Sequence, residues 1–299
     1  MTTTPAGGAT SGSRRSPSPL PRRKVDIGYP DDLDPAWNRR HPEYAYAANS
    51  VSLIMPYAEP YFVKSVRAAL PELEGDPALR AQTEDFLLQE SGHHAQHRRF
   101  NDLVVARMPA VARVERWMRS TYGWLSRTRS LRFNLAFAAA SETIAFAIAR
   151  WTEKHFDDVF DGADPVPTTL FLWHLAEEVE HKQAAYDVFE AVDGSRLRYA
   201  WAALVSLTIL AWLVWLATLT QLFSSNRASE RPGRRGWNPL VYLRLLVKAV
   251  SLSFELLPTL AVSSLPGHHP SSLADPTYLP TWLDTFDPST GRISPPRGL

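Results

Sequence analysis

Apolar residues recur every three or four positions through most of the chain between residues 45 and 195, which is the spacing of one face of an α-helix. No long run of alternating β-branched residues interrupts this pattern. The spacing predicts helices over residues 45–70, 77–107, 109–122, 131–155 and 169–191. We therefore predict an all-α fold for this part of the chain.

The ends of these segments carry residues of typical capping chemistry. A short polar side chain before a helix accepts a hydrogen bond from one of its first free backbone N–H groups. The expected caps are Asp76, with Pro77 at the first helical position, then Ser130, and Thr168 or Thr169. Pro56 and Pro60 lie inside the first segment, so we expect either a kink or a later start of that helix.

The pattern changes after residue 194. Residues 199–223 contain no charged side chain, and about 20 apolar residues suffice to cross a bilayer. Arginines flank both ends of the segment, so the positive-inside rule gives no orientation. We expect this segment to span or lie in a membrane. The alternative is an unusually apolar helix that packs on the bundle or in a homodimer interface.

The remaining segments complete the predicted organisation. Residues 240–263 form an amphipathic helix that either returns along the membrane surface or covers the bundle. The predicted parts are a disordered basic tail (1–30), a helical bundle (31–195), a hydrophobic and amphipathic helical segment (196–264) and an extended Pro/Ser-rich tail (265–299).

Composition narrows the function classes. The net charge is +1, which gives no argument for a nucleic-acid partner, so we expect none. The chain has no cysteine, which excludes disulfides, thiolate metal sites and cysteine nucleophiles. The first 24 residues contain no apolar run that could serve as a signal peptide. We expect a cytoplasmic protein that is attached to the inner face of the membrane through residues 199–223.

Two short stretches repeat one chemical arrangement. Glu90 with His93, and Glu178 with His181, each place a carboxylate and an imidazole three residues apart, hence on one face of a helix. Glu59 and Glu142 stand in apolar stretches of their own. The order Glu, Glu-x-x-His, Glu, Glu-x-x-His is the ligand set of a ferritin-like di-iron four-helix bundle.

Further side chains lie close to this ligand set in the sequence. His174, Glu178 and His181 fall within about 60° of arc on a helix, so His174 is a seventh candidate ligand. In the first Glu-x-x-His window, His94 and His97 compete with His93, which we favour for its symmetry with His181. The residues expected to support the ligands are His97, Asn101, Glu177 and Asp187.

Four carboxylates and three imidazoles favour iron or manganese, because hard divalent cations take oxygen with imidazole nitrogen, whereas structural zinc sites are closed and rich in thiolates. The set is large enough for two metal ions. We expect two irons, with a mixed manganese–iron pair or other divalent metals as the alternatives.

The chain also resembles a known family in four blocks and a C-terminal segment. These are residues 57–67 around Glu59, residues 89–101, residues 138–142, Trp-His-Leu-Ala-Glu-Glu-Val-Glu-His-Lys at 173–182, and Pro-Gly-His-His-Pro at 266–270. They resemble the bacterial family named predicted metal-dependent hydrolase over residues 45–275. Ala58 replaces the usual glycine of that family and Thr143 a frequent histidine. The ligand spacing, including His174, is also similar to that of the di-iron arylamine N-oxygenases.

The pattern favours a non-haem di-iron enzyme that activates dioxygen and oxidises a small or lipid-like substrate. Electrons would come from an external reductase, because the sequence has no flavin or nucleotide motif. The first alternative is a metal-dependent hydrolase with a metal-activated water. The second is a non-enzymatic iron-binding or membrane scaffold protein.

Overall fold

The computed structural model of the chain describes residue 17, residues 19–228 and residues 238–296. All regular elements among these residues are helical. Their β-type pairings are isolated bridges, Asn38 with Ala163 and Asp287 with Arg292. The predicted all-α fold class is therefore confirmed.

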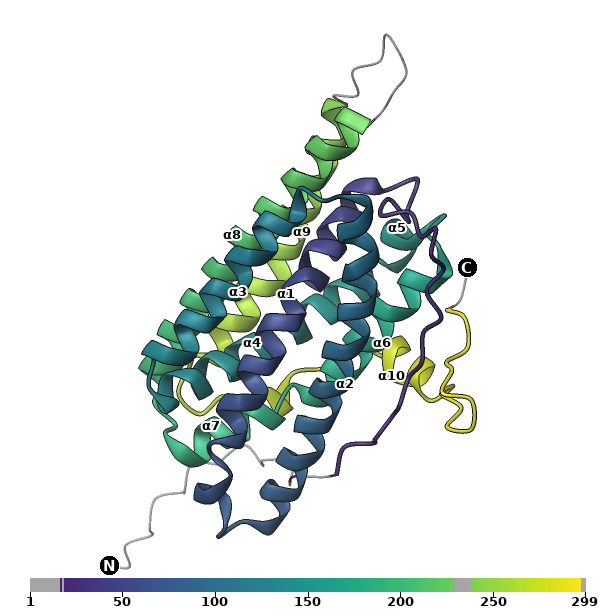
Figure 1. Cartoon of the computed structure of the whole chain (residues 1–299). Coiled ribbons are helices and arrows are strands. Elements are labelled where there is room, and N and C mark those ends of the chain that lie inside the picture. The colour runs from purple at the N-terminus through teal and green to yellow at the C-terminus, as the bar shows by residue number, and fades with distance from the viewer. Residues whose placement is uncertain (1–16, 18, 229–237, 297–299) are drawn as a thin grey trace, which may run out of the picture.

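Four long helices form the centre of the molecule (Figure 1). They are α1 (Pro42–Arg67), α2 (Pro77–Arg107), α4 (Leu131–Lys154) and α6 (Pro165–His181). α1 packs along α2, α4 packs along α6, and the two pairs contact each other. The pairs are joined by α3 (Val111–Thr128), which lies against α1. Two helix pairs joined by one long crossover are the connectivity of ferritin-like bundles.

The predicted helix starts have mixed outcomes. Asp76 and Ser130 accept hydrogen bonds of 3.0 Å and 3.3 Å from the backbone N–H three positions on, so both predicted caps are confirmed. The predicted cap at Thr168 or Thr169 is wrong. Asp164 caps α6 instead, with Pro165 at the first helical position, so the helix starts several residues earlier than predicted.

The two prolines do not delay the start of α1. The helix runs from Pro42 with Pro56 and Pro60 in its interior, so the predicted later start is wrong. Pro56 has no N–H to donate to the carbonyl of Ser52, four residues earlier. The side-chain amide of Asn101 on α2 donates to that carbonyl at 2.8 Å, so the missing helical bond is replaced by a bond between two helices.

The single helix predicted to end near residue 191 is two helices. α6 ends at His181, and α7 (Ala184–Val192) follows after Lys182 and Gln183. Lys182 is 4% exposed. Its ammonium donates to the carbonyl of Leu273 at 2.9 Å and pairs with Asp275. The break thus lies where a buried lysine turns to the C-terminal segment.

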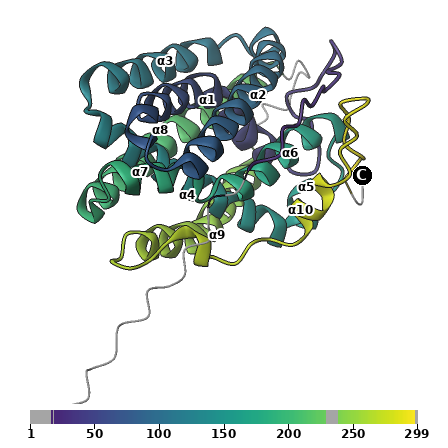
Figure 2. The ribbon, with the colours of Figure 1, turned by 90° about the horizontal axis from the view of Figure 1, so that it is seen from below.

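Two apolar helices, α8 (Arg196–Ala228) and α9 (Pro239–Ser263), cover one side of α1 and α4. Both, like α4, are long and apolar enough to cross a membrane. The molecule buries 67% of the apolar window of α4, but only 33% of that of α8 and 22% of that of α9. α9 forms the edge of the molecule in Figure 2. α4 is thus a core helix, whereas most residues in the apolar windows of α8 and α9 are half-buried or exposed.

The described part of the N-terminal segment is ordered against the bundle. Leu20, Val25 and Ile27 are buried, and Arg23 bonds two carboxylates of α6. The predicted disordered tail is therefore wrong for residues 19–30. The prediction rested on the basic composition of this segment and did not consider the apolar residues between its charges. Residues 1–16 and 18 lie outside the described part of the chain.

The C-terminal segment is not simply extended. It contains α10 (Tyr278–Leu283), in which Leu279, Trp282 and Leu283 are buried. The carboxylate of Glu153 on α4 accepts the backbone N–H groups of residues 277–279, at 2.6 Å and 2.9 Å. This acid fixes the start of α10, which composition alone did not predict. The other short elements are η1 (Leu70–Leu73), α5 (Phe156–Phe160) and η2 (Pro270–Ser272).

Candidate metal centre

The structure brings the seven predicted ligands together in the middle of the bundle. Each of them is at most 8% exposed. α1 contributes one residue, α2 two, α4 one and α6 three. They are Glu59, Glu90, His93, Glu142, His174, Glu178 and His181.

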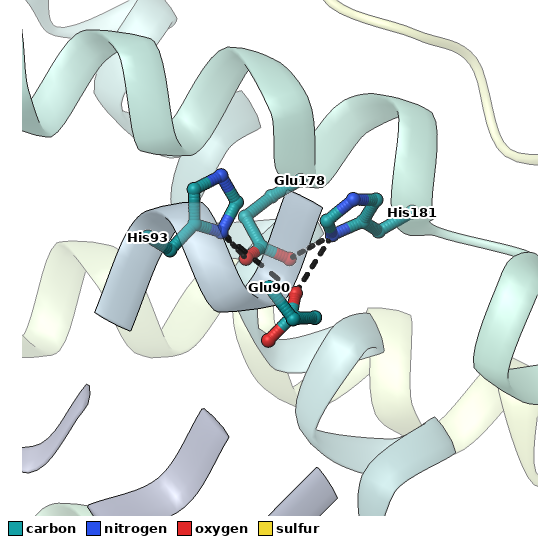
Figure 3. Close-up of side chains that lie close together, drawn as sticks. All are labelled: Glu90, His93, Glu178 and His181. Carbon is teal, nitrogen blue, oxygen red and sulfur yellow. Dashed lines mark ion pairs between the residues drawn. The ribbon is translucent and has the colours of Figure 1, made fainter. Parts of the chain in front are cut away.

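One group of four ligand atoms lies between α2 and α6 (Figure 3). Nδ1 of His181 is 3.0 Å from Glu90 Oε1 and 3.7 Å from Glu178 Oε2. Nδ1 of His93 is 3.8 Å from Glu90 Oε1 and 3.9 Å from Glu178 Oε1. All four ligand atoms lie within 4.8 Å of one another, which is close enough for one small cation to contact several of them.

A second group adjoins the first. Glu59, His97 and His174 also offer ligand atoms within 4.8 Å of one another. Nε2 of His174 is 3.8 Å from Glu59 Oε1 and 2.7 Å from Glu178 Oε1. Glu178 therefore lies within reach of imidazoles in both groups, so it is a carboxylate that could bridge two metal ions.

Glu142 completes the first group from the opposite side of the bundle. Its Oε2 lies 3.7 Å from Nδ1 of His181. It stands among small and apolar residues of α4, as the sequence indicates. The two groups together contain four acidic and four imidazole side chains.

The chemistry of the donor set fits divalent cations. Among the described residues, six of the seven predicted ligands have a buried oxygen or nitrogen without a hydrogen-bond partner, and Glu59 has two such oxygens. Leaving buried polar atoms unpaired is costly. Two like charges 4 Å apart also repel by about 4 kcal/mol at an effective dielectric constant of about 20. Metal ions satisfy these atoms and cancel this repulsion.

Outer partners hold two imidazoles in the orientation that a metal needs. The Nε2–H of His93 donates to Glu177 at 2.9 Å, and that carboxylate is itself bound by Arg23 at 3.2 Å. The Nε2–H of His181 donates to the side-chain oxygen of Gln89 at 2.6 Å. In both rings Nδ1 is the nitrogen that faces the carboxylates. Fixing the outer nitrogen is a recurrent way to orient a metal-binding histidine.

A chain of hydrogen bonds orients the third imidazole. Asn101 donates to the Ser52 carbonyl, so its own oxygen accepts the Ser52 hydroxyl at 2.6 Å. The Ser52 oxygen then accepts Nδ1–H of His97 at 2.8 Å. Nε2 of His97 is left to accept Nδ1–H of His174 at 2.6 Å. Nε2 of His174 therefore faces Glu59 and Glu178.

The pKa shifts describe the same site without metal. Burial raises the pKa of Glu59 well above its usual value, and the charges of Glu90 and Glu178 raise it further. Burial, Glu178 and Glu90 do the same for Glu142. Burial lowers the pKa of His181, but bonding to Glu178 and Glu90 outweighs it and raises that pKa to about 10. At neutral pH, protons therefore occupy positions that metal ions would take.

The neutral state of the hydrogen-bonded histidine pair agrees with its role. Burial lowers the pKa of His97 well below its usual value, and His174 adds to the effect. Burial also lowers the pKa of His174, with the neighbouring His93 as the next cause. Two neutral rings can share one N–H between them. His97, a predicted supporting residue, thus hydrogen-bonds His174.

Three other predicted supporting residues have distinct outcomes. Glu177 and Asn101 contact the ligand network as described above. The expected place of Asp187 is corrected by the structure: its Oδ1 accepts from Nε2 of His269 at 2.7 Å, a residue of the C-terminal Pro-Gly-His-His-Pro segment. His94 is half-buried and belongs to neither ligand group.

Sequence reasoning missed Arg23, Ser52 and Gln89 as partners of the site. Arg23 was assigned to a disordered tail. Ser52 lies seven residues before Glu59, two helical turns away on the same face, which is the signal that could have identified it. Gln89 directly precedes Glu90, and its position opposite His181 depends on the packing of α2 against α6.

A cavity of about 460 Å³ begins at the ligands. Glu59, Glu90, Glu142, His174 and Glu178 line its inner end. Its other walls come mainly from α1, α4, α8 and α9 and are mostly apolar. The metal ligands are therefore accessible to a hydrophobic molecule.

The fold and the site define an all-α protein with a buried carboxylate–histidine centre that indicates a divalent metal pair. The chain belongs to the family described as predicted metal-dependent hydrolase, whose model matches residues 21–274. That description indicates a metal-dependent enzyme and agrees with the resemblance found in the sequence. Neither the curated proteins nor the solved structures contain a match to this chain.

Proposed function

We propose that this protein is a di-iron carboxylate enzyme that activates dioxygen to oxidise a hydrophobic substrate. The observation that carries the proposal is one buried centre of four carboxylates and three imidazoles, of which the four carboxylates and His174 line an apolar cavity. A carboxylate-rich set with imidazole nitrogen suits iron and manganese. Bound iron would supply the redox chemistry that the side chains lack.

The protein's own contribution is positioning and exclusion of water. Gln89, Glu177 and His97 hold the outer nitrogens of the three imidazoles. The apolar lining leaves water few partners in the cavity. A substrate bound there meets the ligands at the inner end, so its position is set by shape and apolar contact.

The proposed reaction balances with an external electron source. Oxidation of a C–H bond to an alcohol inserts one oxygen atom of dioxygen, and the other leaves as water. This uses two electrons and two protons beyond the substrate. A separate reductase protein is the proposed electron donor, because the sequence has no flavin or nucleotide motif.

A metal-dependent hydrolase is the second candidate, and the family description favours it. Two divalent ions would lower the pKa of a bound water and so generate hydroxide. Hydrolysis also requires donors for the negative charge that develops on the substrate. Most of the cavity lining is apolar, and hydroxyl groups in it such as those of Ser141, Ser206 and Thr218 are already hydrogen-bonded to other hydroxyls. This is why we place the hydrolase second.

Dioxygen consumption separates the two candidates. The full chain is loaded anaerobically with ferrous iron, mixed with dioxygen, and followed with an oxygen electrode, with a zinc-loaded sample as the control. We expect rapid uptake by the iron-loaded chain and none by the zinc-loaded one. Binding of two metals without oxygen uptake, together with cleavage of ester or phosphoester substrates by the zinc form, would establish the hydrolase instead. Iron and manganese analysis of the purified chain decides the metal pair.

A further inference from the structure

The outer walls of the cavity are the two apolar helices. Leu207, Leu210 and Val214 of α8 line one side, and Ala249, Leu252 and Leu256 of α9 line the other. α1 and α4 complete the walls and carry two of the ligands, Glu59 and Glu142. The cavity therefore separates α8 from α9 and leads inward to the ligands.

The cavity reaches the molecular surface between these helices. Ala211 of α8 and Leu257 of α9 line the cavity, yet both are exposed, Leu257 to 52%. A residue that is exposed and also lines the cavity marks its mouth. Both residues at this mouth are apolar, so a hydrophobic molecule can enter without meeting a charge.

The surface beside the mouth is apolar on both helices. On α8 the exposed apolar residues follow each other at helical spacing: Leu197, Trp201, Leu204 and Trp212. On α9 the exposed residues include Leu243, Val247, Val250 and Phe254. Spacings of three, four and eight keep each set on one helical face.

A lipid bilayer is the occupant that fits this surface. Exposed apolar patches of this extent mark interaction sites in soluble proteins. The uncharged stretch 199–225 has 27 residues, more than the roughly 20 that cross a bilayer core. Arg196 and Arg198 precede it, where they pair with Glu190 and Asp193, so no unpaired acid of these pairs faces the bilayer boundary. The cavity mouth then opens to hydrocarbon and not to water.

Lys248 is the only lysine or arginine among the described residues of the cavity wall, and it is not a receptor for an anionic headgroup. Nζ of Lys248 lies 3.4 Å from Oε1 of Glu43. Glu43 is fully buried, so the two charges offset each other. An acidic headgroup inside the cavity would have to displace this carboxylate.

We propose that the cavity binds one long hydrocarbon chain of a membrane lipid, which enters from the bilayer between α8 and α9 and presents a carbon to the metal ligands. The polar headgroup stays at the mouth. The cavity volume of about 460 Å³ lies within the range of roughly 300–1,000 Å³ that is typical of small-molecule sites. As a substrate assignment this rests on the proposed function, whereas binding of the chain does not.

Fluorescence of a polyene fatty acid tests the binding step without catalysis. The full chain is titrated with cis-parinaric acid, which fluoresces in an apolar site. We expect saturable binding of one molecule per chain. Displacement by oleate indicates an acyl source, and displacement by farnesol a prenyl source. Absence of saturable binding would overturn the proposal.

Two substitutions with the same new side chain locate the site. Ala211→Trp fills the mouth, whereas Thr208→Trp adds the same ring to an exposed α8 position that does not line the cavity. We expect Ala211→Trp to weaken probe binding at least about tenfold, equivalent to about 1.4 kcal/mol, and Thr208→Trp to leave it unchanged. Ala249→Phe, in the opposite wall, gives an independent blocking variant. Equal binding by all three variants would overturn the assignment.

Vesicles test the source of the chain. We expect the protein to float with vesicles of phosphatidylethanolamine and phosphatidylglycerol, and a Trp212→Glu/Phe254→Glu variant to lose this while still binding the soluble probe. A wild-type homodimer that ignores vesicles, and that this variant dissociates, would replace the bilayer by a second copy and overturn the entry route. Probe binding without any dioxygen uptake by the iron-loaded chain would refute the proposed function and leave the hydrocarbon site intact.

Discussion

The interior of the bundle and the outer surface of α8 and α9 differ in an unusual way: the interior contains acidic side chains, whereas the outer surface exposes large apolar ones. The bundle buries Glu59, Glu142 and Glu178, each at most 4% exposed. The outer helices expose Trp212 to 63% and Phe254 to 77%. Folded proteins normally do the reverse. The buried acids indicate divalent cations as partners of the first region, and we infer that hydrocarbon covers the second.

The two regions are connected by the cavity. Its inner end is made by the buried carboxylates and its mouth by the exposed apolar helices. Apolar residues in the bundle interior would make the fold more stable, and polar residues on the outer faces of α8 and α9 would make it more soluble. We infer that function maintains both departures.

The largest contrast is expected in stability. Phe137 on α4 is fully buried, so Phe137→Ala should cost about 3–5 kcal/mol. Phe254→Ala, the same change on the exposed face of α9, should stay within about 0.5 kcal/mol. Denaturant unfolding of the metal-free chain measures both. Similar losses of stability in the two variants would mean that α9 is covered in solution, and would contradict the assignment of Phe254 to an exposed face.

Metal binding should depend most on the carboxylate shared by both ligand groups. Glu178→Gln keeps the size of the side chain and removes its charge, so the affinity for a second metal should fall by more than about 100-fold, the upper end for loss of an outer partner. The matched control is Glu84→Gln, at an exposed position of α2. Metal analysis after equilibrium dialysis gives the stoichiometry. Two tightly bound metals in Glu178→Gln would remove this residue from the site.

A smaller effect on metal affinity is expected for Gln89, which contacts a ligand residue and is not itself a ligand. Gln89→Leu removes the acceptor of the His181 Nε2–H and should lower metal affinity by about 10–100-fold. Gln89→Glu loses the amide that donates to Glu180 and Pro21 but keeps an acceptor oxygen for His181, so it should retain more of the affinity than Gln89→Leu. Competition with a chromophoric chelator measures both constants. A loss that is equal in the two variants would indicate a packing defect and not loss of ring orientation.

The metal-free protein should lose stability as the pH rises above about 6.5. His181 has a folded-state pKa raised to about 10, so between pH 6.5 and 10 the folded chain holds a proton that the unfolded chain has released. The stabilisation is complete below pH 6.5 and is lost toward pH 10, at no more than about 1.4 kcal/mol per pH unit for one group. Glu59 and Glu142, whose pKa values are also raised, act in the same direction above their unfolded values. Unfolding in chelator across this range measures the slope. Stability that rises with pH there would contradict the assigned protonation.

Much of the helical framework could be predicted from local signals. Asp76 with Pro77, and Ser130, act on the backbone within one turn, so their sequence suffices to place the helix starts. The ligand positions follow equally from spacing, because residues three or four apart share a face of whichever helix carries them. An acidic residue inside an apolar stretch, such as Glu142, indicates a functional site, because burial of a carboxylate without a partner is costly.

The rest depends on contacts between distant segments. Arg23 looks like part of a solvated basic run until α6 supplies Glu177 and Glu180 as partners. The helix break after His181 depends on the contacts of Lys182 with Leu273 and Asp275 of the C-terminal segment. From the sequence alone, Pro56 predicts a kink or a later helix start. In the structure, the Ser52 carbonyl that it leaves without a helical donor accepts the side-chain amide of Asn101. No local pattern encodes such pairings.

The most direct test of the metal centre is a crystal structure of the full chain loaded anaerobically with ferrous iron, with anomalous scattering measured on both sides of the iron absorption edge. We predict two iron peaks among Glu59, Glu90, Glu142 and Glu178, with His93, His174 and His181 as the nitrogen ligands. A single peak, or iron bound elsewhere in the molecule, would contradict the two-metal site from which the proposed chemistry follows.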